Sequence, residues 1–111
     1  MKKEEQLKIN EMCDEVFHWA MYEMNNEGIG WHDYKRLRSC TACVYETSSY
    51  YILRSYSTCI AVIEKSTDTL YDCLRSVYGY TATSAQHISK FDKDYGRGKW
   101  GCEKRYTYRE A

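Results

Sequence analysis

A hydroxyl-rich turn followed by a capped amphipathic helix, at residues 78–95, constrains the fold of this chain more than any other feature. Thr83 lies three residues before Gln86, the spacing of a capping box, in which each side chain binds a free backbone N–H of the other residue. We expect the helix over residues 84–95, with Gly96 ending it as a left-handed cap. One stripe of this helix comprises Ala85, Ile88, Phe91 or Asp92, and Tyr95.

Residues 4–26 show the periodicity of a second helix. Charged side chains take one face, and residues 25–30 (NNEGIG) supply the stop. Apolar side chains recur at spacings of three and four: Leu7, Ile9, Met12, Cys13, Val16, Phe17, Ala20 and Met24. The width of this stripe predicts a helix that faces the core.

Short apolar runs downstream predict a sheet, at residues 43–45, 50–64 and 105–109. The run at residues 50–64 has apolar side chains on both faces near Ile60, which favours a central strand covered by a helix. Residues 70–74 follow a loop of hairpin length and fit a strand. Helical spacing of Leu70, Leu74 and Val77 also fits, so both assignments stay open. Residues 32–38 form a short charged connection with room for one helical turn.

The predicted fold class is α+β, in one domain spanning residues 1–111. Residues 1–33 form an acidic N-terminal helix and turn. Residues 41–111 form the body, a small antiparallel sheet of three to four strands with the capped helix packed on one sheet face. Proline is absent, so no proline-rich linker divides the chain.

Charge is distributed unevenly along the chain. Residues 1–33 hold three lysines and eight carboxylates, a net charge of −5, and residues 34–111 carry +5. An acidic head on a mildly basic body favours an interaction protein over a general DNA coat or an acidic DNA mimic. No apolar run approaches a membrane span, and the charged N-terminus differs from a signal peptide, so we expect a cytoplasmic location, with no membrane partner.

Candidate chemistry is sparse. Cys40 and Cys43 have the spacing of a zinc knuckle but lack a second ligand pair, and other cysteines lie on predicted apolar faces, so we expect structural thiols and no metal or cofactor. Cys40 or Cys43 with His32, and Ser84 with His87, are the only local pairs of nucleophile and base. His87 falls on the polar side of its helix, where a capping or surface histidine is expected. The sequence therefore predicts a protein that is not an enzyme.

Aromatic rings alternate with cations near the C-terminus, and twelve tyrosines against two phenylalanines indicate half-buried sheet faces or a recognition surface. On a strand, Lys104, Tyr106 and Tyr108 would share one face, while Arg105, Thr107 and Arg109 take the other. Such a strand could stack bases, or be an edge strand whose charges block edge-to-edge pairing. The residues expected to bind a partner are Tyr78, Tyr80, Trp100, Lys104, Arg105, Tyr106, Tyr108 and Arg109.

A strand at residues 55–63, a second at Leu70-Tyr71, and the threonine-rich helix start follow in an order that resembles short proteins carried by bacteriophages and mobile elements of Gram-positive bacteria. The resemblance covers residues 55–96 and excludes the N-terminal helix. It implies a small non-catalytic protein that binds and inhibits a host protein, such as a CRISPR effector nuclease, as anti-CRISPR proteins do. The alternative from the residues is a nucleic-acid-binding accessory or regulatory module that uses the cationic C-terminal strand.

Overall fold

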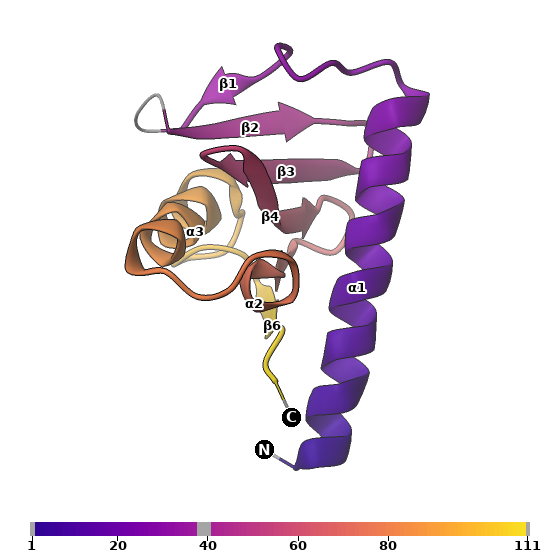
Figure 1. Cartoon of the computed structure of the whole chain (residues 1–111), viewed down its shortest axis with the longest axis vertical. Helices are drawn as coiled ribbons and strands as arrows, with labels where there is room; N and C mark the ends of the chain where they lie inside the picture. Colours follow the sequence, from indigo (N-terminus) through magenta and orange to yellow (C-terminus); the bar gives the residue numbers. More distant parts are fainter. Residues whose placement is uncertain (1, 38–40, 111) are drawn as a thin grey trace.

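The computed structural model describes residues 2–37 and 41–110, and its centre is a six-stranded sheet in which neighbours in space follow the order of the chain (Figure 1). Two longer helices and a single helical turn accompany it. The elements are α1 (Lys3–Asn26), β1 (Lys35–Arg36), β2 (Ala42–Glu46), β3 (Tyr50–Ser55), β4 (Thr58–Glu64), β5 (Thr69–Asp72), α2 (Leu74–Val77), α3 (Ala82–Tyr95) and β6 (Lys104–Thr107).

The α+β class and the N-terminal helix are confirmed, and the sheet is larger than predicted. Strands β1 to β5 pair antiparallel, whereas β6 pairs parallel to β5, so the sheet is mixed. The chain between these two strands passes through α2 and α3, and a crossover of this kind is what a parallel pair requires. Residues 70–77, for which strand and helix were both predicted, begin as strand β5 and continue as helix α2. Each assignment is therefore correct for one part of the segment.

Residues 50–64, expected to form one strand, are a hairpin. Tyr56 at its turn has φ +56°, a left-handed conformation that is uncommon for tyrosine. Arg54 pairs with Cys59 and Leu53 pairs with Ala61, which leaves Ile60 as an extra residue in β4. This bulge places Ile60 and Ala61 in the same apolar cluster, because it interrupts the alternation of the strand.

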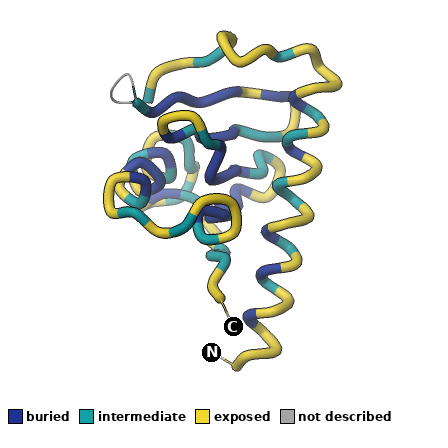
Figure 2. Tube along the Cα trace, viewed as in Figure 1, coloured by how far each residue is buried: buried dark blue, intermediate teal, exposed yellow. Residues whose placement is uncertain are grey.

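The sheet has a core on each face, and the two helices cover opposite faces (Figures 1 and 2). On the α3 side, Ile88 and Phe91 pack on Val44, Leu53 and Leu70. The α1 side is formed by another cluster: Ala20, Met24, Tyr45, Ile52, Cys59 and Val62. Both clusters draw on β4, which explains why that strand is apolar on both faces. No helix among residues 2–37 and 41–110 is long and apolar enough to cross a membrane.

Two amides of α1 close the outer edge of the sheet. The Gln6 amide donates to the Thr107 carbonyl at 3.0 Å. Asn10 binds both backbone groups of Arg109, donating to its carbonyl at 2.6 Å and accepting from its N–H at 3.0 Å. Both amides are buried, whereas Leu7, predicted to face the core, is exposed. The stripe prediction was wrong at this end, because the helix here covers backbone groups of an edge strand, which need polar partners.

The N-cap of α3 is Thr81, and the prediction of Thr83 was wrong. Thr81 Oγ1 accepts from the Ser84 N–H at 3.2 Å, so the helix begins two residues earlier than expected. Gly96 has φ −70° and is not a left-handed cap, which corrects the second expectation for this helix.

His87 is buried, which corrects the prediction of a surface histidine. Its Nδ1 lies 2.8 Å from Ser55 Oγ, and Ser55 Oγ lies 3.0 Å from Ser84 Oγ. Burial lowers the pKa of His87. The three side chains form a polar link between β3 and the first turns of α3, and the predicted pairing of Ser84 with His87 runs through Ser55.

Cys13, Cys59 and Cys73, placed by the sequence on apolar faces, are buried thiols, as is Cys43 in β2. Burial raises the pKa of the Cys59 thiol to about 11, so this group stays neutral at physiological pH. Cys40 lies outside the described residues. Among the described residues, no group of three or more His, Cys, Asp or Glu side chains could hold a metal ion.

The cap assignment predicts that Thr81→Ala destabilises the protein by about 1 kcal/mol, because the Ser84 N–H loses its acceptor. The matched variant Thr83→Ala removes an exposed hydroxyl and should change the free energy of unfolding by less than about 0.5 kcal/mol. Urea unfolding of both variants measures the difference. A larger loss for Thr83→Ala than for Thr81→Ala would contradict the assignment.

Candidate functional site

The eight residues predicted to bind a partner do not form one surface. Tyr78 and Tyr80 are exposed in the connection between α2 and α3. Trp100 lies in the loop that precedes β6, at the end of that strand remote from Arg109. Of the set, Tyr80 and Arg109 are brought together, since both line one pocket.

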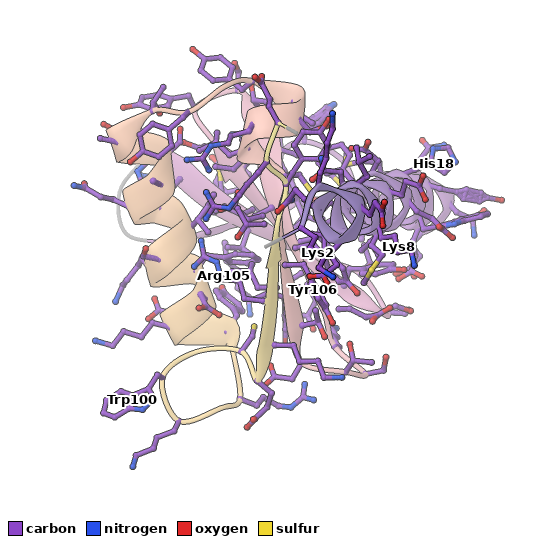
Figure 3. All side chains as sticks on the ribbon, turned by 90° about the horizontal axis from the view of Figure 1, so that it is seen from below. Lys2, Lys8, His18, Trp100, Arg105 and Tyr106 are labelled. Atoms are coloured by element: carbon purple, nitrogen blue, oxygen red, sulfur yellow. The ribbon has the colours of Figure 1, made fainter. Side chains whose placement is uncertain are left out.

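The predicted alternation on β6 is present, but its two faces differ. Figure 3 shows Tyr106 on the side of α1 and Arg105 on the side of α3. Tyr106 and Tyr108 are half-buried and pack against the cluster around Cys13, and the Tyr106 ring lies 5.7 Å from that of Tyr71. These two rings therefore belong mainly to the fold, while Lys104 remains exposed.

Arg105 is the cation of β6 with a defined partner. Its guanidinium lies 3.1 Å from the buried carboxylate of Asp72, with the Arg105 side chain 43% exposed. The same carboxylate accepts from the Leu74 N–H at 3.1 Å and so holds the start of α2. Arg105 is thus part of the fold as well as of the surface.

The loop at residues 96–103 is held in place by hydrogen bonds from its backbone to carboxylates of other elements. The carboxylate of Asp68, in the turn between β4 and β5, accepts from the Arg97 N–H at 3.0 Å and from the Glu103 N–H at 3.0 Å. Asp92, on α3, accepts from the Cys102 N–H at 2.7 Å. Two carboxylates from separate elements therefore hold both ends of the loop.

Asp68 is buried and acts as an anion. Burial alone would raise the pKa of this carboxyl, but the N–H groups of Arg97 and Glu103 outweigh that effect and hold its pKa below the ordinary value of 3.8. Burial and the neighbouring Asp92 carboxylate raise the pKa of the Cys102 thiol, which therefore stays neutral. The loop is anchored by the ionised carboxylate of Asp68 and by Asp92, and both side chains bind backbone amides.

Gly96 and Gly101 lie at points of this loop where a side chain would collide with its surroundings. A Cβ at Gly96 would lie 2.3 Å from the Cys102 nitrogen, and a Cβ at Gly101, where φ is +151°, would lie 2.5 Å from the Asp92 carboxylate. Only a residue without a side chain lets the two arms of the loop and the carboxylate approach so closely. Gly96 therefore has a packing role in place of the predicted capping role.

Trp100 lies at the tip of this loop. The Gly98 N–H donates to the Gly101 carbonyl at 2.7 Å, which closes a tight turn with Lys99 and Trp100 at its apex. The Trp100 side chain is 85% exposed, and the Lys99 ammonium lies 5.4 Å from its ring centroid. Figure 3 shows Trp100 projecting from the loop away from the body of the protein.

The N-terminal helix and the C-terminal part of the chain carry opposite charge. Helix α1 has two lysines and six carboxylates, a net charge of −4, whereas residues 82–109 have seven basic and three acidic residues, a net charge of +4. Asp92 is occupied by the loop, and Asp94 pairs with Lys90 at 3.1 Å. Trp100 thus projects from a cationic segment, which also carries the exposed side chains of Arg97, Lys99 and Lys104.

Sequence reasoning singled out Trp100 and Lys104 as candidates but missed the residues that hold the loop. Asp68 and Asp92 are 24 positions apart, and their shared role depends on the parallel placement of β6. The spacing of Gly96, Gly98 and Gly101 was the available signal, because three glycines in six residues indicate close backbone approach. Comparisons of this chain with protein-family models, curated proteins and solved structures find no match.

The anchoring of the loop predicts that Asp68→Asn destabilises the protein by on the order of 2 kcal/mol at pH 7, because a neutral amide has one acceptor oxygen for the buried N–H groups. Asparagine tolerates the left-handed backbone of this position, so the variant isolates the carboxylate. Urea unfolding as a function of pH measures the effect.

The difference in free energy of unfolding between the wild type and Asp68→Asn should depend on pH. The folded pKa of Asp68 is lower than the unfolded value, so the unfolded chain binds more protons in acid. The stabilisation is complete above pH 3.8 and is lost as the pH falls further, through the folded pKa. A stability difference that stays constant across this range would contradict the role given to the ionised carboxylate.

Proposed function

We propose that this protein is a non-catalytic binding protein, which docks onto an acidic surface of a protein partner through Trp100 and the cations around it. The observation that carries the proposal is an 85% exposed indole at the tip of a loop that two carboxylates hold in place. A single exposed tryptophan is ordinary on a protein surface. Its rigid support is what favours recognition here.

The support matters because of the entropy of binding. A mobile loop would lose conformational freedom on docking, and that loss would subtract from the affinity. The loop at residues 96–103 is already ordered in the free protein by Asp68 and Asp92, so a partner would meet a fixed ring. Tryptophan and arginine are also the residue types that most often dominate the free energy of protein association.

A narrower form of the proposal names the partner. It is a host protein of a bacterial cell, in particular a defence nuclease, and this chain would be the phage protein that inhibits it. This form rests on the resemblance of residues 55–96 to short phage and mobile-element proteins. The acidic helix α1 lies on the sheet face opposite α3, so it would remain free for a second contact while the loop is engaged.

The proposal predicts that Trp100→Ala lowers partner affinity by about 2 kcal/mol or more, roughly 30-fold. The tagged protein is used to capture the partner from a nuclease-treated bacterial lysate, and the affinity of the purified complex is then measured. Trp19→Ala is the matched control, because Trp19 is 50% exposed on α1. Equal affinity for the wild type and Trp100→Ala, or loss only in Trp19→Ala, would contradict the role of the loop.

A second candidate function is nucleic-acid binding, favoured by the net charge of +4 over residues 82–109. Binding through phosphates must weaken steeply as salt rises, and Lys104→Gln together with Arg105→Gln should flatten that dependence. Tight DNA binding at physiological salt, lost in this double variant, would favour this candidate over the protein partner.

A further inference from the structure

We propose that a pocket between α2 and the C-terminal segment binds the phosphate of a nucleotide, with Arg75 and Arg109 on the phosphate and Tyr80 under the base. The pocket has a volume of about 440 Å³ and is lined by Arg75, Gly79, Tyr80, Arg109 and Glu110. It is lined by two arginines that are 34 positions apart in the sequence. The ligand class is a phosphate ester attached to a planar base.

Among the described residues, the two arginines have no ionic or hydrogen-bonding side-chain partner. Neither side chain forms an ion pair or a hydrogen bond with another residue of segments 2–37 and 41–110. Arg105 differs, because Asp72 holds its guanidinium. Each guanidinium carries five N–H donors in a planar fork that matches the oxygens of a phosphate. Two like charges converging on one pocket repel each other, and a bound dianion would remove that repulsion.

Both arginines stand on backbone that is fixed by other contacts. Asn10 binds the N–H and the carbonyl of Arg109, at 3.0 and 2.6 Å. Arg75 lies in α2, which Asp72 holds at its start and which ends where the Gly79 N–H donates to the Leu74 carbonyl at 2.9 Å. Gly79 has φ +115°, a conformation that glycine alone adopts readily, and it turns the chain so that Tyr80 lines the pocket.

Tyr80 supplies a surface for a base. It is 58% exposed, and the Arg75 guanidinium lies 4.7 Å from its ring centroid. An arginine packed on one side of a ring leaves the other side for stacking, and base–aromatic stacking is tolerant of base identity. Glu110 is the one acidic residue of the lining, so its removal should strengthen the binding of an anion.

This site is separate from the loop that carries Trp100. The loop precedes β6, whereas Arg109 follows that strand. Helix α2, which carries Arg75, is a different element from the loop and from β6. Failure of the proposed protein partner would therefore leave the nucleotide site untouched, and the reverse also holds.

The test is NMR titration of the whole protein with three probes: inorganic phosphate, adenosine monophosphate and a short oligothymidylate. We expect shifts at the amides of Gly79, Tyr80 and Arg109. Arg75→Gln and Arg109→Gln should each weaken nucleotide binding roughly tenfold or more. Tyr80→Ala should weaken binding of the nucleotide but not of phosphate, Tyr80→Phe should retain it, and Glu110→Gln should tighten it.

Arg97→Gln is the matched control, because Arg97 is an exposed cation of the Trp100 loop. An oligothymidylate that binds about tenfold more tightly than the mononucleotide identifies a nucleic-acid strand as the ligand. Similar affinities identify a free nucleotide, and both results support the site. Absence of shifts with all probes, or equal losses in Arg97→Gln and Arg75→Gln, would overturn the proposal.

Discussion

The buried carboxylate of Asp68 joins parts of the fold that are distant in the sequence. It lies in the turn before β5 and binds backbone amides at both ends of the loop that precedes β6, while its own carbonyl accepts from the Lys104 N–H at 3.2 Å. These contacts set where β6 begins beside β5. Because the amides stabilise the ionised form, the fold and the shape of the exposed loop depend on the same charge.

The opposite end of β6 depends on α1. Gln6 and Asn10 bind the backbone after the last pairs with β5, so the edge of the sheet is closed by side chains of a helix. The strand is therefore held at its start by carboxylates and at its end by amides. Each end positions an exposed group, Trp100 before the strand and Arg109 after it, and this is why two separate sites are proposed at the two ends of one short strand.

Much of the architecture was predictable from the sequence, because the patterns involved are local. The periodicity of residues 4–26 is long and regular, and α1 spans Lys3–Asn26. The hairpin at Tyr56 was missed because its turn lacks the glycine or asparagine that usually marks a left-handed residue. For α3, the choice of Thr83 rested on its spacing to Gln86, whereas the structure uses Thr81, which lies three residues before Ser84 and accepts from its N–H.

The residues that position the candidate sites could not be predicted in this way, because their partners are remote. Gln6 and Asn10 appear as part of a charged and polar helix face until β6 is placed beneath them, and His87 appears as a surface residue until Ser55 is placed opposite it. Tyr106 was correctly assigned to a strand. Its ring packs against Tyr71 and residues of α1, and no pattern in residues 104–109 indicates that contact.

Amide hydrogen exchange of the free protein, resolved by residue across the loop, tests most directly the claim that the carboxylates of Asp68 and Asp92 preform the Trp100 loop. The account predicts slow exchange at Arg97, Cys102 and Glu103, whose N–H groups bind Asp68 or Asp92, and fast exchange at Lys99 and Trp100 at the tip. Uniformly fast exchange at all five amides would show a mobile loop and would contradict the account.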